Sequence, residues 1–359
     1  MLQEDRGQSV NPVSSTPPPS TSNEPGPIHS LLTFFFEPST SHTLAVIRVF
    51  TGVMIAYIHG VWLLRLDDFF GSHALVDNEF WRVLHAGSVS DAKWNYLVQI
   101  DSLPLIRWHE IAALIAGVFV ALGLFTRMSL LVAWFLTLMT VHRLTGFLFG
   151  LDQIAVMLLT YLCIAQSNSV LSLDRILFFY FPKLQSNRFY TAIAGLKDIA
   201  LHQDISTWNN TLTTRLIQIH LCIIYLFGGL GKLRGEMWWD GSAMWFSSAA
   251  YEYQSLDLTW IGRMPILGAL LTHITLFWEV SYAALIWPKW TRPFVLATAV
   301  LVHGGIACFL GMITFGWIMI VANLVFIPSD LMRRIYPSSR HSIMLKASNT
   351  ELRNAPDRR

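Results

Sequence analysis

Long apolar runs recur along this chain, and they decide what it can fold into. A transmembrane helix needs about 20 mostly apolar residues, and about eight runs approach that length. Inside a bilayer each backbone polar group must be satisfied within its own segment. The sequence therefore predicts an all-α, polytopic membrane protein with about eight transmembrane helices, in a range of seven to nine, plus interfacial helices. The runs lie near Thr43–Leu66, His109–Phe125, Met128–Thr145, Asp152–Leu171, Thr214–Leu230, Pro265–Trp287, Pro293–Leu310 and Ile313–Pro328.

Composition agrees with a membrane protein and excludes several other classes. The 359 residues are 53% hydrophobic and 13% charged, whereas soluble domains carry about 25% charged residues. The net charge of +2 gives no basis for nucleic-acid binding. Cys163, Cys222 and Cys308 lie in apolar runs and have neither zinc-ligand nor disulfide spacing. We therefore expect the lipid bilayer as a partner, with no nucleic acid and no metal site.

The ends of the chain differ from its apolar middle. Residues 1–41 are predicted to form a disordered tail with a short interfacial segment at Leu31–Phe36. Residues 42–330 form the expected transmembrane domain, and residues 331–359 a basic tail. Lys and Arg gather in the connections on the side of both termini, which predicts that both are cytoplasmic. Lys232 would then lie near the opposite face.

The fifth apolar run carries a polar stripe. Gln218, Tyr225 and Lys232 repeat every seven residues and so share one helical face. A lysine at the end of a membrane helix is ordinarily an anchor that reaches the headgroups. Here Gly228, Gly229 and Gly231 precede it, and glycines let a helix or a flat ligand approach the backbone. Lys232 is thus either an anchor or an amine beside a site.

Other ionisable groups lie within the apolar runs, where they usually face the protein interior. Glu279 is in the middle of the sixth run, His303 is in the seventh, and Asp152 begins the fourth. Helix capping, ion pairing or a helix–helix hydrogen bond is the structural alternative for each. Arg48 and His59 share a face of the first run, as cavity-lining groups or as separate packing contacts. We interpret His109-Glu110 and His142-Arg143 mainly as interface residues.

Several of these stretches, taken in order, resemble a known family. The chain resembles the HTTM (horizontally transferred transmembrane domain) family, the bacterial relatives of vitamin K-dependent gamma-carboxylase. The resemblance spans roughly residues 43–328. The matching stretches are Arg48-Val-Phe-Thr-Gly52, Gly150-Leu-Asp152-Gln153-Ile154, Ser172-Leu-Asp174-Arg175, Tyr225-Leu-Phe-Gly-Gly-Leu-Gly-Lys232-Leu with Trp239-Asp-Gly241-Ser-Ala243, Phe277-Trp-Glu279, His303 and Gly311-Met-Ile-Thr-Phe315.

This resemblance implies chemistry with a reduced quinone, such as vitamin K or menaquinone hydroquinone. The lysine of the carboxylase that resembles Lys232 is the proposed base that deprotonates the hydroquinone; oxygen then generates a stronger base, which removes a glutamate γ proton before carbon dioxide adds. Burial favours the neutral amine that such a base requires. The residues expected around this base, as pocket or pKa-tuning groups, are Asp152, Gln218, Tyr225, Glu279 and His303.

Two departures from the carboxylase bear on the substrate. The carboxylase has a histidine near the start of its corresponding fourth span, where this chain has Gly150-Leu-Asp152-Gln153. The chain also continues for only about 30 residues after its last apolar run, without the large luminal domain that holds the protein substrate of the carboxylase. The expected substrate is a separate protein or a small molecule. The expected location is the bacterial inner membrane. The alternative is a non-enzymatic membrane protein, either a transporter or a quinone- or lipid-binding component.

Overall fold

The computed structural model describes residues 26–71, 74–85, 95–195, 206–252 and 255–335. Regular structure in these ranges is almost entirely helical, as the apolar runs predict. The exception is an antiparallel pair of two-residue strands, β1 (Ser39–Thr40) and β2 (Ser206–Thr207). Of the predicted disordered tail, residues 1–41, and the predicted basic tail, residues 331–359, only residues 26–41 and 331–335 are described, and the rest lie outside the described residues.

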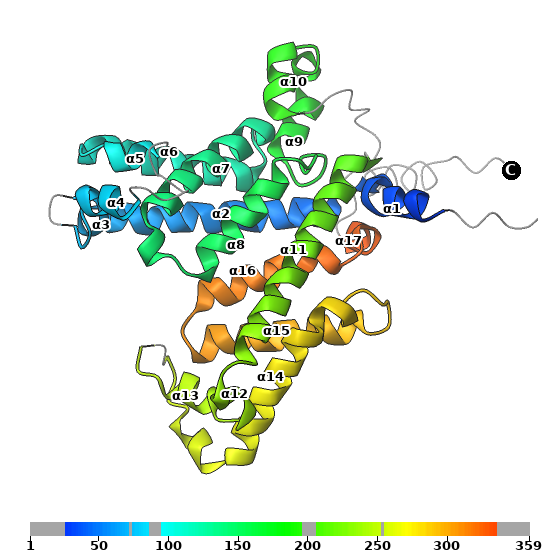
Figure 1. Cartoon of the computed structure of the whole chain (residues 1–359). Coiled ribbons are helices and arrows are strands. Elements are labelled where there is room, and N and C mark those ends of the chain that lie inside the picture. The colour runs from blue at the N-terminus through cyan, green and yellow to red at the C-terminus, as the bar shows by residue number, and fades with distance from the viewer. Residues whose placement is uncertain (1–25, 72–73, 86–94, 196–205, 253–254, 336–359) are drawn as a thin grey trace, which may run out of the picture.

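One half of the molecule is built on three neighbouring helices. α2 (His42–Leu64), α6 (Leu103–Leu122) and α7 (Thr126–Arg143) run side by side (Figure 1). A shorter helix, α8 (Gly150–Leu162), packs against α2 and α7 and also contacts the other half of the molecule. Most residues of α8 are buried, so this helix lies in the common core.

Small residues allow α2 and α6 to pack closely. A Cβ atom on Gly52 would lie 2.3 Å from the Ala121 nitrogen, and one on Gly117 would lie 2.8 Å from the Ala56 nitrogen. Glycine and alanine alternate on both helices at a spacing of four residues, which brings the two backbones together. This contact packs α2 and α6 closely along their length.

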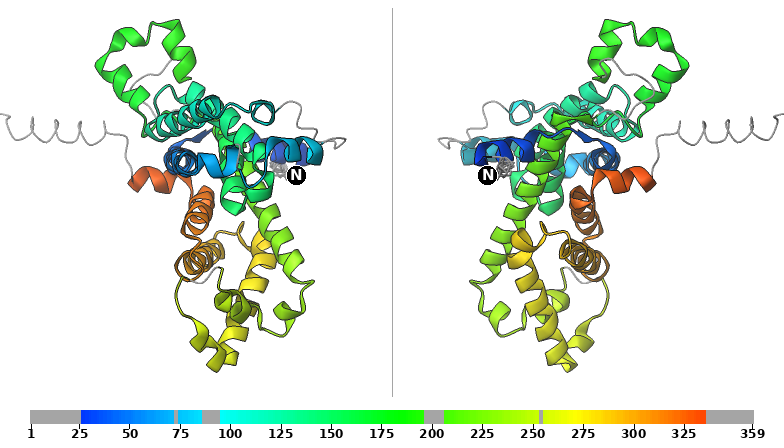
Figure 2. Two further views of the ribbon diagram at one scale, coloured as in Figure 1. Left: turned by 90° about the vertical axis from the view of Figure 1, so that its left-hand side faces the viewer. Right: turned by 90° about the vertical axis from the view of Figure 1, so that its right-hand side faces the viewer.

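The other half contains α11 (Trp208–Lys232), α14 (Pro265–Leu285), α15 (Arg292–Phe309) and α16 (Ile313–Asn323). α11 packs against α14, and α15 packs against α16. α16 also contacts α2 and α8, which joins the two halves. The side views in Figure 2 show α14, α15 and α16 below the half that contains α2 and α7.

Shorter helices lie at the ends of the long ones. The expected interfacial segment at residues 31–36 falls within a helix, α1, which packs against α11. The short elements are α1 (Pro27–Phe36), α3 (Leu66–Phe70), α4 (Asn78–His85), α5 (Tyr96–Gln99), η2 (Thr145–Phe147), α9 (Leu173–Tyr180), η3 (Pro182–Leu184), α10 (Arg188–Ala194), α12 (Glu236–Trp239), α13 (Ala243–Ala249), η4 (Thr259–Arg263), η5 (Leu324–Phe326) and α17 (Ser329–Ile335).

Five of the described helices are long and apolar enough to cross a bilayer: α2, α6, α11, α14 and α15. The segment Ile313–Phe326 followed by α17 makes a sixth if its two parts, bent by 110°, count as one span. Pro328 lies at this bend, where a proline ends the preceding helical geometry. The protein is therefore a multi-pass helical membrane protein, but the expected count of eight spans is not confirmed.

The described residues contain fewer spanning helices than the expected eight because two expected spans, α7 and α8, do not qualify. α7 has 18 residues, but Arg127, His142 and Arg143 near its ends make it too polar to count among the five apolar helices. α8 has only 13 residues, which rise about 20 Å and fall short of a hydrocarbon core of about 30 Å. The apolar run continues through Cys163, Ile164 and Ala165, but the helix ends at Leu162, and a polar turn lies at Ser167 and Asn168.

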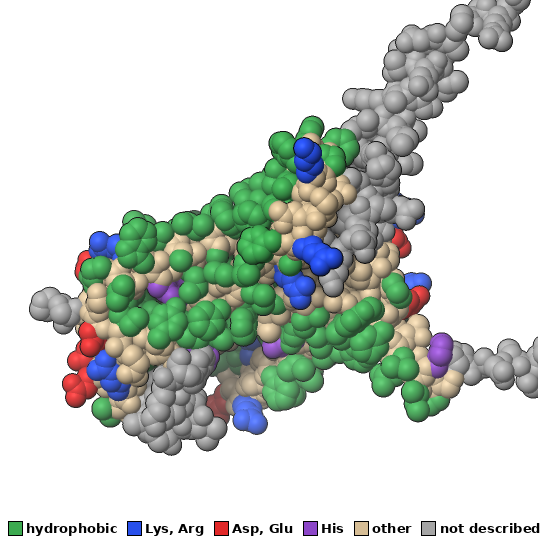
Figure 3. Space-filling model, turned by 90° about the horizontal axis from the view of Figure 1, so that it is seen from above, with side chains coloured by type: hydrophobic (Ala, Val, Ile, Leu, Met, Phe, Trp, Pro, Cys, Tyr) green, Lys and Arg blue, Asp and Glu red, His purple; other side chains and the backbone are tan. Residues whose placement is uncertain are grey.

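The outer surface of the long helices is apolar. Figure 3 shows hydrophobic side chains over much of one face, with most of the acidic side chains toward its two ends. Such a surface suits lipid contact, because acyl chains offer no hydrogen bonds to polar groups. The exposed apolar residues on the five long helices include Val53, Tyr57, Ile115, Val118, Ile223, Phe227, Ile274, Phe277, Val300 and Leu301.

Candidate functional site

Helices α11 and α14 approach each other closely at Gly229. A Cβ atom at this position would lie 2.8 Å from Val280 Cγ2 and 3.0 Å from the Val280 nitrogen. Both distances are below ordinary van der Waals contact, so a glycine is needed for this approach. The approach brings the last turn of α11 against Glu279 on α14.

Lys232 points to this carboxylate. Its Nζ donates to Glu279 Oε2 at 2.5 Å, and the ammonium lies 5.4 Å from the centre of the Trp238 ring. The Lys232 side chain is 29% exposed and that of Glu279 is 12% exposed. An anchor that reaches the headgroups would leave its amine in water. Lys232 and Glu279, the two ionisable groups whose roles the sequence leaves most open, therefore form a pair.

A second polar group lies two helical turns before Lys232, on the same face of α11. Tyr225 Oη is 2.7 Å from His303 Nε2 and accepts a hydrogen bond of 2.8 Å from Asn323 Nδ2. Tyr282 Oη donates to Asn323 Oδ1 at 2.6 Å. Because the Asn323 nitrogen is itself a donor, His303 Nε2 is the partner to which the Tyr225 hydroxyl can donate. Four helices thus meet in one buried hydrogen-bonded chain.

Aromatic rings surround this chain and exclude water from it. The Tyr225 ring lies 5.0 Å from Trp278 and 4.0 Å from Tyr282, measured between ring centres. Phe315 packs edge-on against His303 at 5.9 Å. The remaining imidazole nitrogen of His303, Nδ1, is buried and has no hydrogen-bond partner in the described structure. A neutral imidazole that accepts from Tyr225 carries its proton on this nitrogen.

A groove lies on the other side of Phe315, between α8, α11 and α16. Its volume is about 560 Å³, and its walls are mostly apolar. One polar pair reaches it: the Tyr161 hydroxyl is 2.9 Å from His220 Nδ1. Lys232 does not line this groove. The lining residues are Gly150, Gln153, Ile154, Val156, Met157, Thr160, Tyr161, His220, Ile224, Phe315 and Met319.

No protein-family model, curated protein or solved structure matches this chain. Its site is therefore interpreted from its own chemistry. An amine–carboxylate pair and a phenol–imidazole pair lie on one face of α11, in mostly apolar surroundings. Such pairs can pass protons where water is scarce. No three His, Cys, Asp or Glu residues come together as a metal site in the part of the chain that the structure describes.

Two of the residues expected near the base lie elsewhere. Gln218 donates to the Val325 carbonyl at 3.0 Å and accepts from Arg215 at 2.9 Å, so it ties α11 to η5, just after α16. Asp152 accepts from the Phe149 nitrogen at 3.1 Å and caps α8. Both side chains are buried. Their contacts fit the structural alternatives of a packing hydrogen bond and a helix cap.

Arg48 is also a packing residue. Its guanidinium is fully buried and donates to the carbonyls of Val120, at 3.1 Å, and Leu171. A Cβ atom on Gly123 would meet this guanidinium, so the glycine makes room for it. Arg48 therefore binds the end of α6 to the chain before α9, and it does not share a cavity wall with His59.

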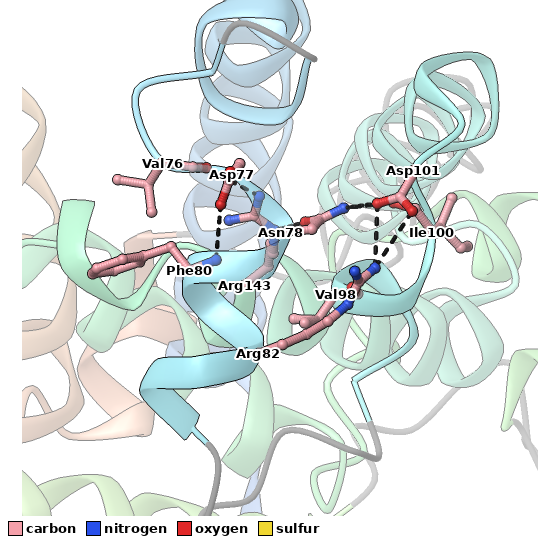
Figure 4. Close-up of polar contacts among 9 residues, drawn as sticks. All are labelled: Val76, Asp77, Asn78, Phe80, Arg82, Val98, Ile100, Asp101 and Arg143. Carbon is pink, nitrogen blue, oxygen red and sulfur yellow. Dashed lines mark hydrogen bonds and ion pairs between the residues drawn. The ribbon is translucent and has the colours of Figure 1, made fainter.

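Arg143, His109 and Glu110, interpreted mainly as interface residues, are buried within the protein. Arg143 Nε donates to Asn78 Oδ1 at 2.9 Å, and its guanidinium packs 5.5 Å from the rings of Phe70 and Trp81. Figure 4 shows Arg143 reaching from α7 to Asn78 at the start of α4. The helix ends here are covered by other protein segments, which apolar runs alone do not reveal.

Asn323, Tyr282 and Trp278 were not expected at the site. Asn323 is the lone amide in the last apolar run, and a buried amide without partners is costly in a bilayer. That cost is a signal that it must bond to another helix. Tyr282 and Trp278 give no comparable signal, because aromatic residues are ordinary in membrane helices.

Proposed function

We propose that this membrane protein acts on a reduced quinone, as a quinol-dependent carboxylase- or oxidase-like enzyme in which Lys232 is the base. The observation that carries the proposal is the Lys232–Glu279 contact of 2.5 Å, because it gives a terminal lysine a carboxylate partner within the protein. The resemblance to the gamma-carboxylase relatives supplies the reaction class. The proposed location is a bacterial inner membrane with both termini in the cytoplasm.

Glu279 gives Lys232 a way to become a base. An ion pair in apolar surroundings is costly, because each charge loses its hydration. Transfer of one proton from Nζ to Oε2 leaves a neutral amine and a neutral acid, which removes both charges. The free electron pair of the amine can then accept a proton from a hydroxyl group. Glu279 would be the residue that stores the first proton.

The surface beside this pair suits a flat ring. A Cβ atom on Gly228 would lie 3.7 Å from Glu279 Oε2 and 3.9 Å from Lys232 Nζ, so the pair borders this glycine. A Cβ on Gly231 would meet nothing within 4 Å. The bare backbone between them would bind the ring, with Trp238 at its edge. A bound reduced quinone would supply the acidic hydroxyl and the reducing electrons.

The groove between α8, α11 and α16 supports the non-enzymatic alternative. Its volume of about 560 Å³ lies in the range of small-molecule sites, and Lys232 is not part of its wall. A quinone- or lipid-binding protein would use this groove alone and would need no base. The two functions therefore differ in whether Lys232 is required for turnover and in whether quinone turns over at all.

The test uses the purified full-length protein in lipid nanodiscs. Menaquinol or vitamin K hydroquinone is added without oxygen, oxygen and bicarbonate are then admitted, and quinone products are quantified by mass spectrometry. We expect turnover in the wild type and a loss of about 100-fold or more in Lys232→Met, the size expected for removal of a general base. Lys289→Met, at an exposed lysine, is the control and should keep full turnover.

The outcomes separate the two functions. Turnover that persists in Lys232→Met, at the level of Lys289→Met, would reject Lys232 as the base. Quinone that co-purifies and exchanges but never turns over in the wild type would favour the binding protein. Binding that is lost on Ile224→Trp, which fills the groove, would then locate the quinone there.

A further inference from the structure

A second buried polar system lies between α2, α6 and α7, apart from Lys232. At its centre His59 Nδ1 is 2.6 Å from Glu110 Oε2, and both side chains have no exposed surface. The other carboxylate oxygen, Oε1, accepts from Thr140 Oγ1 at 2.8 Å. An acidic group this deeply buried is costly and is usually retained for a role in binding or proton transfer. The pair is held by hydrogen bonds on both oxygens.

A chain of hydrogen bonds leads from Glu110 toward the surface. Thr140 Oγ1 is 2.9 Å from His109 Nε2, and His109 Nδ1 is 2.5 Å from Tyr96 Oη. His109 and Thr140 are buried, whereas Tyr96, on the short helix α5, is partly exposed. The chain thus begins at a partly exposed phenol and ends at a carboxylate with no exposed surface.

One direction of donation satisfies each bond in this chain. Thr140 has a single hydrogen, and it is donated to Glu110, so Thr140 must accept from His109 Nε2–H. A neutral His109 then has a bare Nδ1, which accepts from the Tyr96 hydroxyl. Burial, and next the negative charge of Glu110, raise the pKa of Tyr96 to about 12, so the phenol keeps its proton to donate. All donors between Tyr96 and Glu110 therefore point toward the carboxylate.

We propose that the His59–Glu110 pair is an internal proton-binding site, loaded and unloaded through Thr140, His109 and Tyr96. Loading breaks the Thr140 O–H bond as a bond to Glu110 Oε1 forms. The Nε2–H of His109 restores the Thr140 hydroxyl, the Tyr96 phenol protonates Nδ1, and water returns a proton to the phenol. One proton moves inward and no electrons are exchanged; the reverse sequence releases it.

The neighbours of the pair are consistent with this assignment. His59 Nε2 lies 3.0 Å from Thr137 Oγ1, on the side away from Tyr96. Asp152 on α8 and His109 on α6 are ionisable groups close to His59. These groups, with Glu110 and Tyr96, are the titratable side chains that face the site from α2, α5, α6 and α8. From α7 the site receives the hydroxyls of Thr137 and Thr140.

Two threonines on α7, one turn apart, give a matched pair of variants. Thr140 lies between Tyr96 and Glu110, whereas Thr137 lies beyond His59. Each is replaced by valine in ¹⁵N-histidine-labelled, full-length protein in nanodiscs, and the exchange of the His59 ring proton with water is followed by NMR. His59→Gln identifies the resonance. We expect Thr140→Val to slow exchange by about 100-fold, the scale of a lost proton-transfer group, and Thr137→Val to leave the rate unchanged.

Tyr96→Phe is the second test, because it removes one hydroxyl from a partly exposed position without touching the buried pair. Tyr96→Phe should slow exchange as Thr140→Val does. If Thr140→Val fails to fold, Tyr96→Phe alone tests the proposal. Wild-type rates in both Tyr96→Phe and Thr140→Val would overturn the proposal. Slower exchange in Thr137→Val alone would do the same, because protons would then reach His59 from its other side.

Discussion

Lys232 Nζ donates to Glu279 Oε2 at 2.5 Å across the interface of α11 and α14. The contact requires the helices to approach closely, and Gly229 permits that approach one turn earlier. A charge at the end of a transmembrane helix is thereby directed to a partner within the protein. The stability of this interface and the chemistry proposed for it depend on the same two side chains.

Removing either partner should destabilise the protein more than removing both. Lys232→Met or Glu279→Gln leaves the other group without its partner in apolar surroundings, which costs about 1–3 kcal/mol. The double variant leaves no unpaired charge and should recover most of that loss. Thermal unfolding in one detergent measures all three variants. Additive losses in the double variant would mean that the two groups do not interact.

The polar stripe on α11 shows which features of the site the sequence can predict and which it cannot. A seven-residue spacing predicts that Gln218, Tyr225 and Lys232 share a face, and they do. Their partners, however, lie on different elements: Val325 after α16, His303 on α15 and Glu279 on α14. Periodicity specifies the direction of a side chain within one helix. The choice of partner depends on how several helices pack, and no single segment encodes that.

The number of spans shows a different limit. Hydropathy identifies apolar residues but not where a helix stops, and α8 stops at Leu162 although apolar residues continue beyond it. Burial of α8 by protein on several sides explains its apolar character without a full crossing of the bilayer. In the same way Glu110, interpreted as an interface residue, is buried because α2 and α7 cover it. Composition does not distinguish a lipid-facing side chain from a protein-facing one.

Gly229 and Gly231 should respond oppositely to alanine. A Cβ on Gly229 would lie 2.8 Å from Val280 Cγ2, so Gly229→Ala should push α14 away and cost about 1–3 kcal/mol. Gly231 has open space, and Gly231→Ala should be neutral or stabilise the helix by up to about 1 kcal/mol. Unfolding temperatures in detergent compare them. Equal effects of the two variants would show that the α11–α14 contact is not close in the native protein.

The connection between α5 and α6 should contribute a small pH dependence to stability. Asp101 accepts from Asn78 Nδ2 at 2.7 Å and lies 3.3 Å from Arg82, as Figure 4 shows. The hydrogen bond from Asn78, and next the charge of Arg82, lower the pKa of this carboxyl. Its contribution is therefore present above the ordinary aspartate pKa of about 4 and is lost as the pH falls below it.

Asp101→Asn isolates this contribution. The unfolding temperature of the wild type should exceed that of the variant near neutral pH, and the difference should shrink as the pH falls through about 4. Added salt should also reduce it, because the carboxylate is exposed to solvent. A difference that stays constant with pH would indicate that the ionised form of Asp101 makes no contribution.

The close packing of α2 on α6 gives the last prediction. A Cβ on Gly52 would lie 2.3 Å from the backbone nitrogen of Ala121, an atom that cannot move without shifting α6. A Cβ on Gly60, two turns later on α2, would meet only the Leu114 side chain at an ordinary 3.7 Å. Gly52→Ala should therefore separate the helices and cost about 2 kcal/mol or more, whereas Gly60→Ala should cost nothing. Because His59 and Glu110 lie on these same two helices, Gly52→Ala should also lengthen their contact, and the His59 ring resonance would move in that variant alone.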